Sequence, residues 1–180
     1  MQSLRGRLLL ASPALLDPNF RRAVVLIVEH DDEGAVGLVL NRPSETEVAE
    51  AVPTLSDLVE PGSPVSVGGP VQPNAVCVLA EWDDRDAAGS IVFADIGLMP
   101  AESDPTQAAA AMRRARVFAG YAGWSAGQLE GELDEPSWIL AHAEVEDVFD
   151  ADSDLWASVL RRKGGEFKLL ATMPEDPSLN

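Results

Sequence analysis

Residues 23–40 read AVVLIVEHDDEGAVGLVL, two apolar runs that are separated by a short acidic turn. The first run, residues 23–30, is rich in β-branched residues and almost continuously apolar, which is typical of a strand covered on both faces. The DDEG turn at 31–34 and the second run, residues 35–40, predict a β-hairpin. The sequence therefore predicts a buried sheet at the centre of the fold.

Strand-like and helix-like segments alternate on both sides of this hairpin. Further strands are predicted within residues 1–16 and at residues 65–67, 75–81, 90–94, 116–121 and 138–142. Helices are predicted at 45–51, behind a Ser44–Glu47 capping box, at 105–115, behind Asp104, at 155–163, and after the glycine-rich stretch 120–127. Because hairpins and crossovers are interleaved and no linker divides the chain, residues 1–180 are predicted to form a single α+β domain with a mixed sheet.

Charge and cysteine content limit the partners and the compartment. The 180 residues carry 30 acidic and 13 basic side chains, a net charge of −17. Such a surface repels duplex DNA and anionic lipid, so DNA binding would need a local basic patch such as Arg113, Arg114 and Arg116. The single cysteine, Cys77, excludes an internal disulfide, predicts a cytoplasmic protein and is expected to be a buried, unreactive thiol. No apolar run is long enough to predict a membrane span.

The stretch GYAGWSAGQLEGEL at 120–133 contains the G-x-S-x-G pattern of a nucleophile elbow. A serine hydrolase at Ser125 would need a histidine, and His142 lies 17 positions further along in an acidic tract. The same serine also fits a capping box with Gln128, which is reason enough for its presence. We favour the cap and keep the Ser125–His142 hydrolase as the alternative.

The glycines of this stretch support a second hypothesis. Gly127 would leave the first turn of the following helix bare, and a bare helix start suits an anion. Trp124 would then form an apolar wall beside it. Close packing of strand against helix, with Trp124 in the core, explains the same residues equally well.

Metal and cofactor sites are not expected. Asp150, Asp152 and Asp154 match the first ligands of a calcium loop, but Leu155 stands where glycine is required and Arg161 where glutamate is required. Two histidines and one cysteine, far apart in sequence, do not suggest zinc. Gly68-Gly69-Pro70 lacks the lysine and spacing of a phosphate-binding loop.

Five ordered motifs together resemble the YqgE/AlgH family of bacterial proteins. They are GRLLLASP (6–13), DPNFRRAVVLIVEH (17–30), GAVGLVLNRP (34–43), VGGPV (67–71) and GYAGWSAGQLEGEL (120–133). The resemblance implies a compact α+β fold with a strongly curved, barrel-like sheet flanked by helices. It implies no established enzyme class, and one branch of the family is named as a transcriptional regulator. The family pattern leaves the position of Ser125 free, which argues against a nucleophile.

The polar and glycine positions of these motifs define the predicted site. The ligand-binding residues are predicted to be His30, Asn41, Arg42, Gly68, Gly69, Pro70, Trp124, Gly127 and Gln128. We expect these segments to converge on one surface of a non-enzymatic binding or regulatory protein that recognises an anion. The partner could be a phosphate-bearing metabolite, an acidic peptide or a nucleic-acid end. A protein-interaction module that uses Trp124 is a further alternative, and the oligomeric state stays open.

Overall fold

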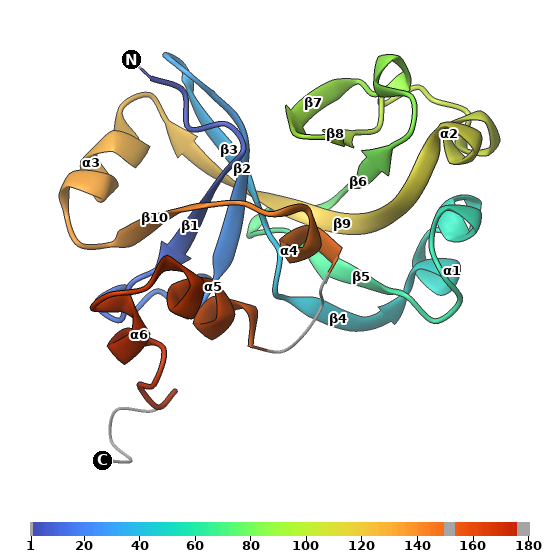
Figure 1. Ribbon diagram of the computed structural model, residues 1–180. Helices are drawn as coiled ribbons and strands as arrows, with labels where there is room; N and C mark the ends of the chain where they lie inside the picture. Colours follow the sequence, from blue (N-terminus) through green and yellow to red (C-terminus); the bar gives the residue numbers. More distant parts are fainter. Residues whose placement is uncertain (1, 150–153, 176–180) are drawn as a thin grey trace.

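A ten-stranded sheet organises the fold, as the computed structural model of residues 2–149 and 154–175 shows (Figure 1). The strands are β1 (Arg7–Ala11), β2 (Val24–Asp31), β3 (Gly34–Val39), β4 (Pro43–Glu47), β5 (Pro64–Val67), β6 (Val71–Trp82), β7 (Ser90–Phe93), β8 (Ile96–Leu98), β9 (Met112–Ser125) and β10 (Trp138–His142). The helices are α1 (Val48–Ala51), α2 (Pro105–Ala111), α3 (Gln128–Asp134), α4 (Val145–Phe149), α5 (Leu155–Lys163) and α6 (Phe167–Leu170), with short 3-10 helices η1 (Pro53–Leu58) and η2 (Arg85–Ala87).

The strand order is β10-β1-β2-β3-β9-β6-β8-β7, and β5 joins β4 to β9. The β5–β9 pair is parallel and all others are antiparallel, so the predicted mixed sheet of an α+β domain is confirmed. The predicted strongly curved, barrel-like sheet is wrong, because the path is open: among the described residues, no ladder joins β7 to β10 or β1. A barrel requires every strand to be paired on both edges.

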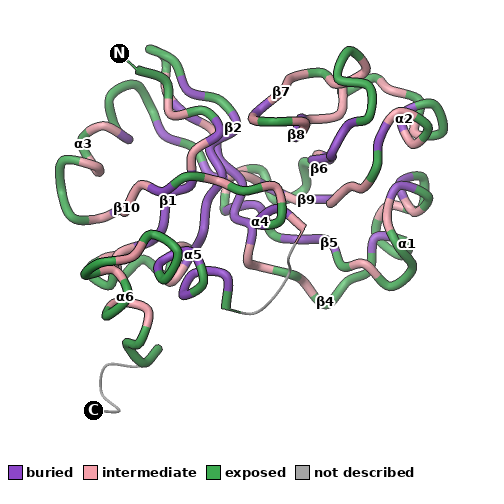
Figure 2. Tube along the Cα trace, in the orientation of Figure 1, coloured by how far each residue is buried: buried purple, intermediate pink, exposed green. Residues whose placement is uncertain are grey.

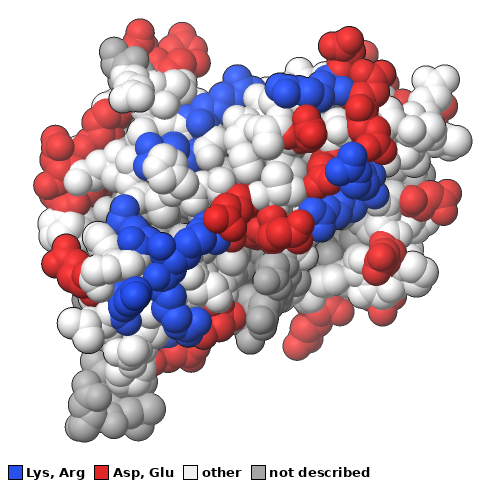
Figure 3. Space-filling model, in the orientation of Figure 1, with Lys and Arg blue, Asp and Glu red and all other residues white. Residues whose placement is uncertain are grey.

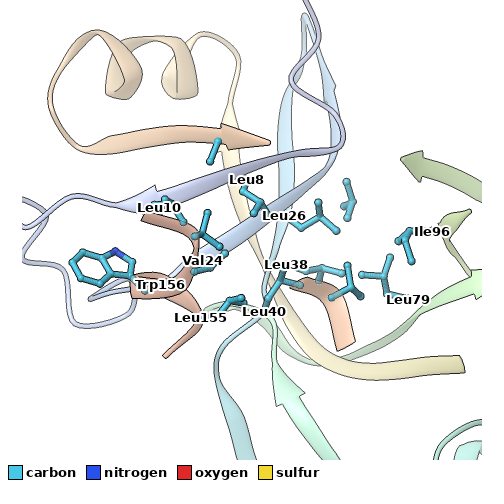
Figure 4. Packing of buried hydrophobic residues seen from close by; sticks show 14 of the residues in the cluster. Leu8, Leu10, Val24, Leu26, Leu38, Leu40, Leu79, Ile96, Leu155 and Trp156 are labelled. Atoms are coloured by element: carbon cyan, nitrogen blue, oxygen red, sulfur yellow. The ribbon is translucent and has the colours of Figure 1, made fainter. Parts of the chain in front are cut away.

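Strand β2 is buried on both faces, as its continuous apolar run predicts (Figure 2). Its alternate side chains enter two separate cores. Val24, Leu26 and Val28 pack with strands β1, β3 and β6 and with Trp156 of α5 on one face (Figure 4). Val25 and Ile27 pack with Trp124 and Trp138 on the other face.

The long strand β9 joins the two halves of the sheet. Its last residues pair with β3 along one edge, from Gly34↔Ser125 to Gly37↔Ala122. Its first residues pair with β6, from Trp82↔Met112 onward. The predicted helix at 105–115 is therefore wrong beyond Ala111, because pairing with β6 overrides local helix propensity in the arginine-rich segment.

Of the two helix caps predicted before residue 120, one is present in the structure and the other is not. Asp104 accepts a hydrogen bond from the Thr106 amide (2.9 Å), which confirms the predicted cap of α2. The helix predicted at 45–51 is wrong over its first half, where β4 extends to Glu47 and pairs with β5. The expected Ser44–Glu47 capping box does not form, because Ser44 instead bonds to the Thr46 backbone.

The helix predicted at 155–163 is confirmed: α5 spans Leu155–Lys163 and ends before Gly164, and the short helix α6 that follows it was not predicted. The rejected calcium-loop residues Asp150 and Asp152 lie outside the described residues. Figure 3 shows a group of basic side chains over α5 and α6, and further basic and acidic groups lie side by side elsewhere on this face. Within the described part of the chain, no helix is long and apolar enough to cross a membrane.

Candidate functional site

The glycine-rich stretch forms a closed corner between β9 and α3. Gly127 is the N-cap residue of α3 and adopts a left-handed backbone conformation, with φ +77°. The side chain of Gln128 folds back, and its Oε1 accepts hydrogen bonds from the Ser125 amide (3.0 Å) and the Ser125 hydroxyl (3.2 Å). Half of the predicted capping box is thus present: glutamine returns to the serine amide, but the serine hydroxyl does not accept from Gln128.

The Ser125–His142 hydrolase is not supported. Four strand spacings separate β9 from β10 in the sheet, which places the two side chains on the order of 19 Å apart. The other histidine, His30, is only 1% exposed at its side chain and is bonded to Glu130 (2.7 Å). Ser125 therefore has no base within reach among the described residues.

Trp124 is part of the core of this corner. It is 6% exposed and packs against Phe20 and Trp138, with ring centroids 6.5 and 6.1 Å away. Its indole Nε1 donates to Glu132 (2.7 Å), and the Nε1 of Trp138 donates to the same carboxylate oxygen (2.9 Å). Packing and hydrogen bonding thus account for Trp124 without a ligand.

The start of α3 is already occupied by negative charge from the protein itself. Glu130 lies in the first turn, and the side chain of Glu132 accepts from Gln128 (3.2 Å). The hydrogen bond from His30 lowers the pKa of Glu130, so this carboxylate is charged at neutral pH. His30 accepts from the Leu4 amide at Nδ1 (2.9 Å), which fixes Nε2 as the donor to Glu130. These carboxylates at the start of the seven-residue helix α3 oppose the binding of an anion there.

Asn41, Arg42 and the Gly68-Gly69-Pro70 turn lie at the opposite end of β3. Asn41 is a structural clamp, because its side chain accepts from the Val24 amide (2.9 Å) and donates to the Arg22 carbonyl (2.9 Å). Gly68 is hydrogen-bonded to two strands. Its amide donates to the Ala119 carbonyl (2.8 Å), and its carbonyl accepts from the Val39 amide (2.9 Å).

Arg42 shares a small cavity with Gly69 and Pro70. The cavity has a volume of about 260 Å³ and is also lined by residues 18, 19, 39, 43 and 67. The guanidinium donates to the carbonyls of Asn41 and Arg21, and burial lowers the pKa of Arg42. The structure therefore divides the predicted site in two: Arg42, Gly69 and Pro70 lie together, while His30, Trp124, Gly127 and Gln128 lie at the far end of β3. The expected convergence on one surface is wrong.

A larger cavity opens at the first half of β9. We call it the arginine cavity; it has a volume of about 620 Å³ and is lined by residues 57–61, 63, 64, 66, 113–117 and 149. It forms because β5 and β9 pair only at Ser66↔Phe118 and Val67↔Ala119 and diverge before that point. Pro64, at the start of β5, has no amide hydrogen with which to extend the ladder.

Arg116 lies in this cavity with an unusual environment. It donates to the Val148 carbonyl (2.7 Å) and the Ser66 hydroxyl (2.6 Å), and its guanidinium lies 4.9 Å from the Phe118 ring centroid. It forms no ion pair with any carboxylate of the described residues. Burial lowers the pKa of Arg116 to about 10.

Arg113 and Arg114, by contrast, form ion pairs with acidic side chains. Both contact the buried carboxylate of Glu81, at 2.7 and 3.0 Å. Arg113 also contacts Asp83 (2.8 Å) and Arg114 contacts Glu146 (2.7 Å). The sequence predicts a local basic patch at these arginines and a helix end at the first two, but no cavity. Three arginines in four positions of so acidic a chain are the signal that could have pointed to one.

No metal centre is indicated: within residues 2–149 and 154–175, no three His, Cys, Asp or Glu side chains are placed to hold an ion.

Comparisons with known proteins agree with the motifs. The family described as AlgH-like matches residues 8–168. The chain is 44% identical to a UPF0301 protein of Thermobifida fusca, covering 99% of this chain and 96% of the relative. It is 43% identical to one of Mycobacterium tuberculosis, covering 97% and 90%.

Two solved structures have a similar fold. A crystal structure of a Corynebacterium diphtheriae protein matches with TM-score 0.88 and 26% identity, covering 96% of this chain and 94% of the other. The solution structure of the AlgH protein from Pseudomonas aeruginosa matches with TM-score 0.73 and 30% identity, covering 97% and 98%. The family predicted from the motifs is confirmed, and the chain belongs to the AlgH-like UPF0301 family.

Proposed function

We propose that this protein is a non-enzymatic binding protein that holds an anionic ligand in the arginine cavity. The observation that carries the proposal is Arg116, a partly buried cation that lines the cavity and has no carboxylate partner among the described residues. A guanidinium has five N–H groups. Two hydrogen bonds from Arg116 go to the protein, which leaves donors for a ligand.

The remaining donors are accessible from the cavity. Arg116 Nε donates to none of the described residues, and no buried side-chain nitrogen or oxygen among these residues lacks a partner. The Nε atom therefore has some contact with solvent, and because Arg116 lines the cavity we infer that a ligand there can bond to it.

The energetics favour an anion at this place. Burial destabilises the charge of Arg116, as its pKa of about 10 indicates, and an anion would restore the interactions lost with water. A charge-assisted hydrogen bond of this kind contributes about 1.5–3 kcal/mol. The volume of about 620 Å³ lies within the range of small-molecule sites.

We infer a regulatory rather than a catalytic role for this cavity. A ligand between β5 and β9 would hold together two strands that otherwise separate, and such a change could be transmitted to a partner. The named regulatory branch of the family supports this role, and the single cysteine supports a cytoplasmic location.

Calorimetric titration with a panel of anions tests the proposal. The panel contains acetate, longer carboxylates, inorganic phosphate, sulfate and nucleotides. We expect at least one to bind the native protein and to bind Arg116→Gln at least about tenfold more weakly. Arg85→Gln is the matched control, because Arg85 is exposed and forms only a long ion pair with Asp95 (3.8 Å). Absence of binding across the panel, or equal binding by Arg116→Gln, contradicts the proposal.

The Arg42 cavity is the second candidate, as the sequence motifs suggested. Arg42 is partly desolvated and its hydrogen bonds go to neutral carbonyls, so it too has charge to offer an anion, although Glu175 already interacts with that charge electrostatically. The volume of about 260 Å³ suits only a small ion. If Arg42→Gln removes binding of phosphate or sulfate while Arg116→Gln does not, this second site is the functional one.

A further inference from the structure

The distribution of charge in the arginine cavity indicates which class of anion fits, an inference that rests on the proposed function. The first step is the count of cations. Glu81, Asp83 and Glu146 already compensate Arg113 and Arg114 through ion pairs of 2.7–3.0 Å. Among the described residues that line the cavity, Arg116 is thus the one cation without a carboxylate partner.

The second step concerns the acidic residues on the wall opposite β9. Asp57, in η1, and Glu60, just after it, both line the cavity and are exposed. Neither forms an ion pair with a described residue. Two carboxylates on this wall repel any further negative charge on a ligand.

The third step concerns the surface between these charges. Leu58, Val59, Pro61 and Pro64 line one side of the cavity, and Val117 lines the side formed by β9. Leu58 and Val117 are buried in the core and form the rigid base of the cavity, while Val59 is half-buried and Pro61 and Pro64 are exposed, so these three supply the accessible apolar surface. An apolar ligand body would bury area here without displacing a polar group.

We propose that the arginine cavity takes a small monocarboxylate with an apolar body, whose carboxylate meets Arg116 and whose far end is uncharged or, preferably, cationic. The cation would lie near Asp57 and Glu60. Dianions, polyphosphates and nucleic-acid ends are rejected, because their second charge has no free guanidinium and meets the two acids.

A ligand series that varies only the far end tests this inference. Octanoate, 8-aminooctanoate and suberate have eight-carbon chains and end in a methyl, an ammonium and a second carboxylate. Calorimetry at low salt should rank the affinities as 8-aminooctanoate, then octanoate, then suberate. We expect about a threefold difference at each step, because the far-end charges are partly screened by water. The six- and ten-carbon series are measured alongside, so that chain length does not decide the outcome.

Two variants separate the ends of the ligand. Arg116→Gln should weaken all three ligands at least about tenfold. The double variant Asp57→Asn with Glu60→Gln should remove the differences among the three ligands while octanoate binding stays within about twofold. Both acids are exposed, so this variant is expected to fold normally.

The possible results are distinguishable. The expected ranking, lost in the double acid variant, supports the inference. Suberate or ATP binding as tightly as octanoate, with loss in Arg116→Gln, overturns the inference and leaves the proposed function standing. Octanol binding as tightly as octanoate, without an effect of Arg116→Gln, overturns both. Absence of binding by all of these ligands and by inorganic phosphate also overturns both.

Discussion

The two ends of strand β9 belong to the same strand, but one is closed by its own side chains and the other is open. At the end near α3, Trp124 donates to Glu132, Ser125 to Gln128, and His30 bonds to Glu130. At the beginning, Arg116 lines a cavity of about 620 Å³ and lacks a carboxylate partner among the described residues. Polar side chains whose hydrogen-bond partners all come from the protein stabilise the fold. A polar side chain that lines a cavity and has unused hydrogen-bond donors indicates a binding site.

The comparison also changes how the motifs are interpreted. The glycine-rich stretch resembled a site because glycine, tryptophan and serine are common in sites. At Gly69 and Gly120 the structure supplies a different reason. An added Cβ at Gly69 would lie 2.2 Å from the Tyr121 carbonyl carbon, and one at Gly120 would lie 2.4 Å from the Gly69 carbonyl oxygen. Two backbones pass too closely there for any side chain.

The largest expected effect is therefore at this backbone crossing. Gly69→Ala should lower the free energy of unfolding by more than about 4 kcal/mol, because the methyl group overlaps the β9 backbone and φ is +156°. Urea denaturation measures the loss. Gly131→Ala is the control: its Cβ would meet nothing within 4 Å, so the helix should gain up to about 1 kcal/mol. Equal stability of Gly69→Ala and the native protein would refute the close approach.

A second effect tests the hydrogen bonds of the closed end. Glu132→Ala removes the acceptor of two indole N–H groups in a buried cluster. We expect a loss of about 2–3 kcal/mol in the free energy of unfolding, because buried donors without partners are costly. Glu135→Ala, in the exposed residue after α3, should change stability by less than about 0.5 kcal/mol. A similar small change for both variants would mean that the indoles find other partners.

A third effect tests the middle of β9, where Cys77 of β6 lies opposite Phe118. Cys77 is half-buried rather than fully buried as predicted, but desolvation raises its pKa to about 11, in agreement with the unreactive thiol predicted from the sequence. At pH 8 alkylation by iodoacetamide should be about 100-fold slower than in the urea-unfolded protein, because the thiolate is the reactive form. The rate should rise about tenfold per pH unit and level off only above pH 11. A rate that levels off near pH 9 would show an exposed thiol.

The smallest effect is expected at the open end. Arg116→Met replaces a guanidinium that has no carboxylate partner in the described structure by an apolar side chain of similar length. We expect the free energy of unfolding to stay within about 1 kcal/mol of the native value, because relief of desolvation offsets the two lost hydrogen bonds and water from the cavity that Ser66 lines replaces the guanidinium as its donor. Thermal and urea denaturation measure this. A loss as large as that of Glu132→Ala would indicate a structural role for Arg116 and would remove the contrast between the two ends.

The sequence predicts the central architecture well and the site poorly. The hairpin at 23–40, the two-sided burial of β2 and helix α5 follow from local patterns that the structure keeps. The path of β9 does not, because Arg113 and Arg114 have the spacing of a helix end, and only pairing with β6 makes them a strand. The cavity depends on where β5 and β9 diverge, which is a relation between segments about 50 residues apart and has no local signature.

The positions of the predicted site residues show the same limit. Arg42 and Gly69 are brought together, as the motifs suggested, but Gln128 is at the other end of β3. Residues of neighbouring motifs in the sequence need not lie on the same surface, because the pairing of the strands decides which of them come into contact.

One measurement compares the two ends directly. Amide ¹H–¹⁵N spectra recorded during titration with 8-aminooctanoate report on every part of β9 in a single experiment. Our account predicts that the amides of Ser66 and of residues 113–117 shift in proportion to occupancy, while those of Ser125, Gly127 and Gln128 stay in place. Shifts confined to residues 123–130, with residues 113–117 unmoved, would contradict it and place the binding site at the glycine-rich corner.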